Sequence, residues 1–275
     1  MIKRILVALS GTLYTTSAIR HAIQLANLHD AEITGAAVLD LEAMADVGAV
    51  PLGGSAAASH LVQHRLARSS EALKATVKEF EDACNESGVR HRVTIEEGDP
   101  FEKLFDLWRY HDLTILGLRR LFEFEVVENP TDYLRRLVDA GLRPLLATAE
   151  TYRPIARVLI SYNGSWESAK AMKRFIQKHP WPDLTFKIVC FKPKPPEARV
   201  LLSAAADYCT AHGYEVETEH LEGSAREGLL LHAETWKADT IVLGATHRNH
   251  LSQIVLGDTA LHLIKHSPIP LFLAQ

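Results

Sequence analysis

The sequence predicts an α/β protein built from two tandem, doubly wound units, each with a five-stranded parallel sheet. Short runs rich in valine, isoleucine and leucine alternate along the chain with longer segments of helical period. This alternation is typical of a parallel sheet covered by helices on both faces. The same series of landmarks also occurs twice. The length of 275 residues suits two domains of ordinary size, each able to bury its own core.

The repeat is visible in the order of its landmarks. Each half begins with an apolar run that ends at a glycine and a hydroxyl residue, a later glycine precedes a helical stretch, and a buried-looking strand then ends on glycine. The paired landmarks are Gly11-Thr12 with Gly164-Ser165, Gly98 with Gly223, and Gly117 with Gly244. The last two pairs are separated by 125 and 127 residues (223 − 98 and 244 − 117). Two copies of one domain are the simplest explanation, and we place them at 1–150 and 151–275.

The elements of the first half follow from apolar runs and helical periodicity. We predict strands at 2–9, 32–39, 90–96, 112–117 and 144–148, and helices at 15–28, 60–87, 100–110 and 130–140. Pro100 falls in the first turn of its helix and Gly88 directly after another, where a missing donor and a positive φ do least harm. Residues 42–59 are small and glycine-rich without a clear period, so we expect a connecting loop there.

The second half repeats this pattern. We predict strands at 155–162, 184–191, 214–220, 239–244 and 270–274, and helices at 166–178, 196–212, 225–237 and 258–266. It lacks the glycine-rich insertion, and 191–196 connects a strand to a helix instead, so the loops over the equivalent sites differ in reach and charge. Right-handed crossovers between parallel neighbours place any ligand beyond the carboxyl ends of the strands, where the winding reverses.

Composition excludes several classes of protein. A formal net charge of −4 gives no electrostatic reason to expect nucleic acid or an anionic membrane as a partner. The three cysteines, Cys84, Cys190 and Cys209, form no CxxC pair, so we expect reduced thiols and neither a disulfide framework nor a thiolate zinc site. No apolar stretch approaches the roughly 20 residues that span a bilayer, and the N-terminus reads as a strand. We therefore expect a cytoplasmic protein.

The order of these landmarks resembles the universal stress protein family in its tandem two-domain form, over essentially the whole chain. In that family the first strand ends in an Asp-Gly-Ser-like turn, and a Gly-Asp-Pro-like turn precedes the third helix. The fourth strand then leads into a motif of Gly, two residues, Gly, nine residues, Gly and a hydroxyl residue, which holds the phosphates of ATP in nucleotide-binding members. The resemblance implies a Rossmann-like fold of the adenine-nucleotide-hydrolase type. Glycines let backbone N–H groups approach an anion closely, and a helix N-terminus adds a favourable dipole.

The second half keeps the frame of this motif. The resemblance implies that ATP or AMP would be held there by Asn163, Gly164, Ser165, Gly244, His247, Gly257, Asp258 and Thr259. His247 replaces a glycine, and Asp258 places a carboxylate where a hydroxyl would donate, which adds about one to several kcal/mol of repulsion toward a nearby anion. Thr259 or protonated His247 would offset part of this repulsion. Asn163 stands where the family has Asp at the base end of the site, so donor and acceptor roles differ.

The first half departs further from the motif. Gly117 is followed by Leu118-Arg119-Arg120, and Pro130, which has no N–H to donate, stands where a glycine is expected. Ser10 replaces the acidic residue at the base end. We therefore do not expect this site to hold ATP in the manner of the family. Arg119 and Arg120 could meet a phosphate or carboxylate from outside, but a solvated basic turn is the favoured interpretation.

The number of histidines raises the question of a metal site, but their spacing gives it little support. Four of the 14 fall near the second site, namely His247, His250, His262 and His266. His262 with His266, and His60 with His64, are spaced to share a helix face. His247-x-x-His250 beside Asp258 allows a zinc hypothesis, but no HExxH or Cys/His cluster is present, so unliganded histidine is favoured. Chain-wide, no GxSxG elbow supports nucleophilic catalysis, and we assign no catalytic or metal-binding residue. Trp166 alone among the tryptophans is placed near a site mouth.

We therefore expect a stress-response protein that binds and regulates and is not primarily an enzyme, with an adenine nucleotide as the candidate ligand of the second half. Two alternatives stay open. One is a slow nucleotide hydrolase or nucleotide-sensing switch at the same site. The other is an interaction module in which both sites are empty. The resemblance also implies that strands 144–148 and 270–274 meet, which would form a pseudo-dimer within one chain. A homodimer of two chains is a further expectation.

Overall fold

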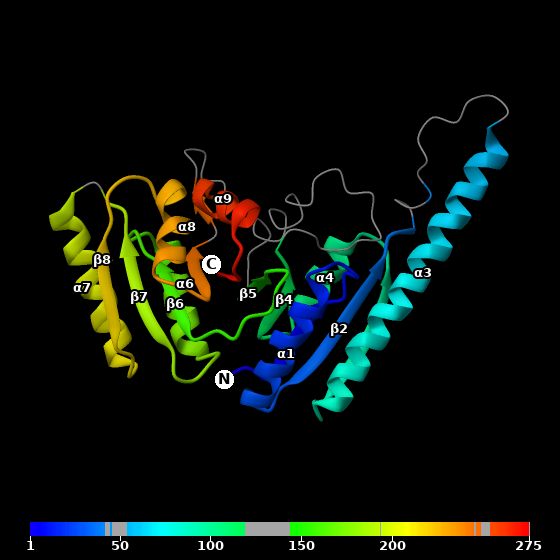
Figure 1. Cartoon of the computed structure of the whole chain (residues 1–275), viewed down its shortest axis with the longest axis horizontal. Coiled ribbons are helices and arrows are strands. Elements are labelled where there is room, and N and C mark those ends of the chain that lie inside the picture. Colours follow the sequence, from blue (N-terminus) through cyan, green and yellow to red (C-terminus); the bar gives the residue numbers. More distant parts are fainter. Residues whose placement is uncertain are drawn as a thin grey trace.

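The computed structural model describes residues 1–41, 45, 54–118, 144–192, 194–244, 246–248 and 254–274. Its first half contributes five strands, β1 (Arg4–Ala8), β2 (Glu32–Leu39), β3 (His91–Glu97), β4 (Leu113–Gly117) and β5 (Leu145–Thr148). Its second half contributes β6 (Arg157–Ser161), β7 (Thr185–Cys190), β8 (Val216–His220), β9 (Thr240–Gly244) and β12 (Leu271–Ala274). The two halves lie side by side and share one sheet (Figure 1).

The strand order of the sheet is β3-β2-β1-β4-β5-β12-β9-β6-β7-β8. All neighbours within the first half are parallel, and so are those within the second half. Each half is therefore the predicted five-stranded parallel, doubly wound layer. The strands that start the windings, β1 and β6, lie at the middle of each layer, so the winding reverses between β1 and β4 and again between β6 and β9.

The two layers are joined into one continuous ten-stranded sheet. β12 pairs antiparallel with β5, with Phe272 opposite Leu146 and Leu273 opposite Leu145. The sequence predicted that these two final strands would meet, but it described two sheets where the structure has a single one. Both strands are fully buried, and all of their residues except Thr148 are apolar. Pairing them with each other removes two unpaired edges that would otherwise be exposed.

Seven described helices cover the two faces of the sheet. They are α1 (Thr15–His29), α3 (Ser55–Glu86), α4 (Pro100–Trp108), α6 (Trp166–Lys178), α7 (Pro195–Ala211), α8 (Ala225–Thr235) and α9 (Asp258–His266). Alternate strand residues enter different cores, since Ile5 packs with the side chains of α1, α3, α6 and α7, whereas Leu6 packs with those of α4, α8 and α9. Each core runs across the β5–β12 seam. The period of two along each strand sorts the apolar residues between these layers.

Contacts between the halves also occur away from the seam. Trp181 donates a hydrogen bond from Nε1 to Gln24 Oε1, 3.0 Å away, and is almost fully buried. His29 Nε2 lies 2.9 Å from the carbonyl oxygen of Pro180. The C-terminal half therefore rests on α1 as well as on β5.

The predicted elements agree with the structure to within a few residues at most ends, with two corrections. Residues 55–59, predicted as loop, belong to α3, which begins at Ser55. They are rich in alanine, a strong helix former, and the first buried side chain of this helix is Leu73, so this segment has no apolar face for periodicity to detect. It extends past the sheet (Figure 1). A short antiparallel pair, β10 (Thr246–Arg248) with β11 (Ile254–Leu256), was not predicted.

The other loop residues, 42–44 and 46–53, and the helix predicted at 130–140 lie outside the described residues. None of the helices in the described part of the chain combines the length and the apolar character that crossing a bilayer requires. The three cysteines are buried and unpaired. Burial raises the pKa of the Cys84 thiol to about 12, so this thiol stays protonated and unreactive at neutral pH.

Candidate functional site

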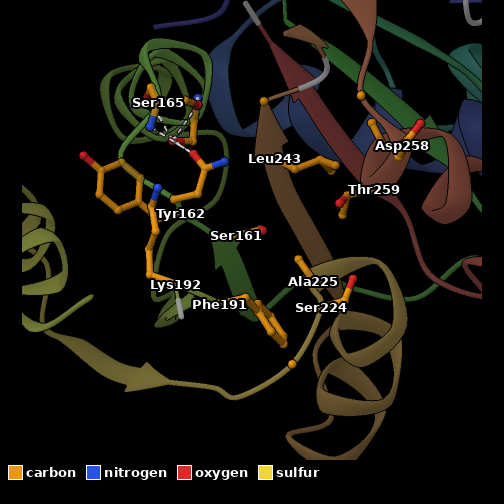
Figure 2. A pocket seen from close by; sticks show the side chains of 16 residues that line it. Ser161, Tyr162, Ser165, Phe191, Lys192, Ser224, Ala225, Leu243, Asp258 and Thr259 are labelled. Carbon is orange, nitrogen blue, oxygen red and sulfur yellow. Dashed lines mark hydrogen bonds between the residues drawn. The ribbon is translucent and has the colours of Figure 1, made fainter. Parts of the chain in front are cut away.

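A cavity of about 470 Å³ lies at the carboxyl ends of β6 and β9, where the winding of the second half reverses. Its described lining consists of Ser161, Tyr162, Asn163, Ser165, Ser168, Phe191, Lys192, Gly223, Ser224, Ala225, Leu243, Gly244, Gly257, Asp258, Thr259 and Ala260. Figure 2 shows Tyr162 and Ser165 across the cavity from Asp258 and Thr259. The volume falls within the range of about 300–1,000 Å³ that is usual for small-molecule sites.

The turn after β6 is closed by its own side chains. Asn163 Oδ1 accepts hydrogen bonds from the Ser165 backbone N–H, at 2.9 Å, and from Ser168 Oγ, at 3.0 Å. Ser165 Oγ accepts from the Ser168 N–H at 3.1 Å and so caps α6. Gly164 occupies the left-handed region at φ +79°, which a residue with a Cβ adopts only with strain. The Asn163 carbonyl oxygen and the Ser165 hydroxyl therefore accept hydrogen bonds within the turn itself.

Gly244 is a glycine because α6 passes directly over it. A Cβ at this position would lie 2.6 Å from the carbonyl carbon of Glu167 and 2.8 Å from the Ser168 nitrogen, both backbone atoms. The first glycine of the motif is thus required by helix–strand packing, whatever occupies the cavity. Its position nevertheless brings β9 and the start of α6 together at the cavity floor.

Two helix N-termini face the cavity without a side-chain cap. α8 starts after Ser224 and α9 after Gly257, and at neither position does a side chain accept from the first amides. The first N–H groups of a helix have no intrahelical partner, and the helix dipole adds positive potential there. Residues from both helix starts line the cavity. This arrangement suits an anion, in contrast to the self-capped start of α6.

The charges of the lining are few. Lys192 reaches the cavity from the end of β7, and Asp258, the first residue of α9, supplies a carboxylate. In the view of Figure 2 the Asp258 oxygens point away from Tyr162, whereas the Thr259 hydroxyl points toward it. Thr259 can therefore donate into the cavity, and the carboxylate stands at its rim.

Six of the eight residues predicted for this site line the cavity, namely Asn163, Ser165, Gly244, Gly257, Asp258 and Thr259. Gly164 shapes the turn between two of them. The main chain of His247 belongs to β10, and its side chain lies outside the described part of the structure, as does all of His250. The comparison of spacings did not assign roles to Tyr162, Lys192 or Ser224. The loop at 191–196 and the landmark at Gly223 were the signals that could have identified the last two.

The equivalent turn of the first half is closed and buried. Ser10 Oγ lies 2.8 Å from Thr12 Oγ1 and 2.9 Å from Thr15 Oγ1, and all three residues are at most 6% exposed. These positions precede Asn163, Ser165 and Ser168 by the same offset (163 − 10, 165 − 12 and 168 − 15). Hydroxyls thus satisfy each other here. Arg119, Arg120 and Pro130 lie outside the described residues.

The histidines in the described part of the chain are not arranged as metal ligands. The rings of His262 and His266 lie with their centroids 4.6 Å apart on α9, tilted by 39° to each other. The pKa of His262 is lowered by desolvation and by the neighbouring His266. No group of three or more His, Cys, Asp or Glu side chains is placed to hold a metal ion among the residues described. Trp166, at the start of α6, is 81% exposed and is not part of the described cavity lining.

The comparisons agree with this architecture. The chain matches the family model described as the Universal stress protein family over residues 1–125 and 191–275. It is 24% identical to Universal stress protein Slr1230 of Synechocystis sp. over 281 residues, which cover 98% of each chain. A universal stress protein from Archaeoglobus fulgidus has a TM-score of 0.67 at 17% identity, covering 98% of this chain and 96% of that one. The functionally unknown protein PA1789 from Pseudomonas aeruginosa has a TM-score of 0.62 at 16% identity, covering 99% and 92%.

Proposed function

The chain belongs to the universal stress protein family, and on this basis we propose that it is a stress-response regulatory protein that binds a nucleotide in the cavity of its second half. ATP and AMP are the first candidates, because the family motif that the second half resembles holds the phosphates of ATP. The residues proposed to bind are Asn163, Gly164, Ser165, Gly244, His247, Gly257, Asp258 and Thr259. We keep the domain boundary at residue 150.

The observation that carries this proposal is the convergence of uncapped α8 and α9 on one cavity at the switch point of the sheet. Phosphates are well matched by free amides at helix N-termini and by the hydroxyls of Ser224 and Thr259 beside them. The opposite end of the cavity offers Tyr162, whose ring provides apolar surface for a base. The cavity thus has an anion end and a base end.

We place binding ahead of turnover. The described lining carries one carboxylate, Asp258, and one ammonium, Lys192, and it contains no histidine, cysteine or arginine. Phosphoryl transfer depends on neutralising charge that develops in the transition state and on orienting the attacking nucleophile. A single lysine at the mouth supplies little of either. A nucleotide-binding regulatory protein therefore fits these residues better than a hydrolase.

The seam also bears on assembly. β5 and β12 pair with each other within one chain, so the halves form an intramolecular pseudo-dimer and neither strand is left as a sheet edge. The outer edges of the sheet are β3 and β8, which carry charged residues such as Arg92 and Glu217. Charged edges disfavour strand pairing between chains. We propose that a homodimer of full chains uses a surface other than these edges, and light scattering measures whether it forms.

Titration calorimetry tests the proposed ligand class. The full chain is titrated with ATP and AMP, with and without magnesium, and one saturable site per chain is expected. Thr259→Ala should weaken binding, whereas Thr235→Ala, which removes a hydroxyl that bonds Leu231 O at the far end of α8, should not. The absence of binding by every nucleotide would contradict the proposal and favour the interaction module. Product formation during the titration would favour the hydrolase.

A further inference from the structure

Two side chains at the base end of the cavity, Asn163 and Lys192, present hydrogen-bond donors. Asn163 uses its carbonyl oxygen within the turn, where it accepts from the Ser165 N–H and from Ser168 Oγ. A backbone N–H can only donate, so the atom that faces it must be Oδ1 and the orientation of the amide is fixed. The Asn163 NH₂ group makes no hydrogen bond within the part of the chain that the structure describes, and the residue is exposed. Asn163 therefore offers donors to a ligand.

The first half indicates which part of Asn163 the fold needs. Ser10 occupies the equivalent position and closes the same turn with one hydroxyl, through its contacts with Thr12 and Thr15. A single oxygen at this position is therefore sufficient to hold the turn and the start of the helix. The NH₂ group of Asn163 is additional to that structural role, and it belongs to a residue that lines the cavity.

Lys192 adds a second donor at this end. Its ammonium has no ion pair among the described residues, and its side chain lines the same cavity. The backbone oxygen of Lys192 is already engaged, because it accepts from His220 Nε2 at 2.7 Å. The Tyr162 hydroxyl can rotate to donate or to accept, so it does not discriminate. The side chains of Asn163 and Lys192 thus present donors to the cavity, whereas Asn163 Oδ1 and the Lys192 backbone oxygen already accept hydrogen bonds within the protein.

The position of the base follows from the helix caps. α6 starts beside Asn163 and is capped by Ser165, whereas α8 and α9 start without a side-chain cap. An anion gains most where the amides are unsatisfied, so the phosphates belong at α8 and α9. The base is then left with the end formed by Asn163, Tyr162 and Lys192.

We infer that this cavity selects a 6-oxopurine nucleotide, with guanine or hypoxanthine as the base, over an adenine nucleotide. The inference rests on the proposed function and sharpens its ligand class. A 6-oxopurine presents two adjacent acceptors, O6 and N7, whereas adenine presents a donor at N6 beside the acceptor N7. Asparagine reads adenine by using its oxygen and its NH₂ together. In this chain the oxygen is engaged by Ser165 and Ser168, so that pairing is blocked.

The test compares ITP with ATP on the full chain, because the two nucleotides differ only at the 6 position and the adjoining N1 of the purine. We expect ITP to bind about tenfold more tightly than ATP under the same magnesium and salt. Asn163→Ser introduces the residue that the first half has at the equivalent position, Ser10. The substitution keeps an oxygen that can accept within the turn and removes the NH₂ group. It should bring the ITP-to-ATP ratio close to one. Asn163→Asp places an acceptor toward the base and should reverse the preference.

The outcomes separate this inference from the proposed function. Tighter binding of ITP that is lost in Asn163→Ser supports the inference. Equal or tighter binding of ATP by the unmodified chain overturns it and leaves the proposed function in place. If neither nucleotide binds, both are overturned. Thermal unfolding of each variant verifies that the variant is folded. The comparison of ITP with ATP on the unmodified chain remains valid even if a variant does not fold.

Discussion

Lys178 Nζ lies 2.9 Å from Asp112 Oδ1, and this ion pair joins the second half to the first on the side of the sheet where β1 and β4 begin. The other oxygen of Asp112 accepts from the backbone N–H groups of Lys3, at 2.9 Å, and Arg4, at 3.2 Å. Burial raises the pKa of Asp112, but these hydrogen bonds and the lysine outweigh it and hold the pKa below its usual value. Asp112 therefore binds the backbone at the start of β1 with one carboxylate oxygen and Lys178 of the second half with the other.

The repeat supplies a matched control for this pair. Asp239 accepts from Ala156 N at 3.0 Å and from Arg157 N at 2.8 Å, as Asp112 does in the first half, but no lysine pairs with it among the described residues. Lys178→Met should lower the free energy of unfolding by about 0.5–1 kcal/mol, because the pair is partly exposed. Urea unfolding of Lys178→Met, Asp112→Asn and the double variant measures the coupling. The effects of Asp239→Asn and Lys178→Met on the free energy of unfolding should be additive. Coupling between these two substitutions would contradict the assignment of Lys178 as the partner of Asp112.

Gly244→Ala should destabilise the fold by about 1–3 kcal/mol, because the new Cβ would meet the backbone of α6 and force the helix from β9. Gly228→Ala is the control, since its Cβ would lie 2.9 Å from the edge of the Phe191 ring, a side chain that can adjust. Thermal unfolding without nucleotide measures both. If Gly244→Ala unfolds like the unmodified chain, the close packing described for this glycine is wrong.

His21 should make the protein less stable as the pH falls. Burial, and then Arg20, lower its pKa from 6.5 to about 4, and neither ring nitrogen has a hydrogen-bond partner among the described residues. As the pH falls, His21 is protonated near pH 6.5 in the unfolded chain but only near pH 4 in the folded chain. The contribution of neutral His21 is thus complete above pH 6.5 and is lost between these values, up to about 3 kcal/mol.

The measurement is urea unfolding at several pH values between 7.5 and 4. His21→Phe keeps a ring against Tyr152, whose ring centroid lies 4.6 Å from that of His21, and it should flatten the decline. His64→Phe, at an exposed position on α3, should leave it unchanged. An unaltered pH dependence in His21→Phe would show that other groups cause the decline.

Asp258→Asn should tighten the binding of a nucleoside triphosphate. Removing one negative charge at the rim relieves repulsion of about 1 kcal/mol at roughly 4 Å in water, which corresponds to about fivefold in affinity. The gain should shrink as salt is raised. Asp207→Asn removes a charge that is also exposed, on α7 and outside the described cavity lining, and should have little effect. Titration calorimetry at two salt concentrations checks this, and weaker binding by Asp258→Asn would indicate that the carboxylate contacts the ligand favourably.

The sequence predicted the fold well because the inner strands of the sheet are separate, largely apolar runs, whereas the edge strands β3 and β8 carry charged residues. β2 was predicted with the bounds that the structure gives it, and so were α6 and α9. The antiparallel pair of β10 and β11 was missed because strands of three residues are too short for periodicity to reveal. The start of α3 was missed because its first turns are exposed, so no apolar stripe marked them.

The site could be predicted only in part. Gly257 and Thr259, which line the cavity, could be named from the sequence because a motif of fixed spacing points to them. Lys192 was placed in a loop over the site but given no role, because the end of β7 carries no motif. The orientation of Asn163 could not be predicted at all. It depends on a hydrogen bond from the Ser165 N–H, which exists only once the turn has formed.

The central claim is that the second half alone carries a nucleotide site, with the phosphates at α8 and α9 and the base at Asn163. A crystal structure of the full chain grown with ITP and magnesium tests it most directly. We predict density for one nucleotide between Asn163 and Thr259, with the phosphates next to Ser224 and Gly257. A nucleotide bound at the Ser10–Thr15 turn, or an empty second-half cavity at concentrations that saturate binding in solution, would contradict it.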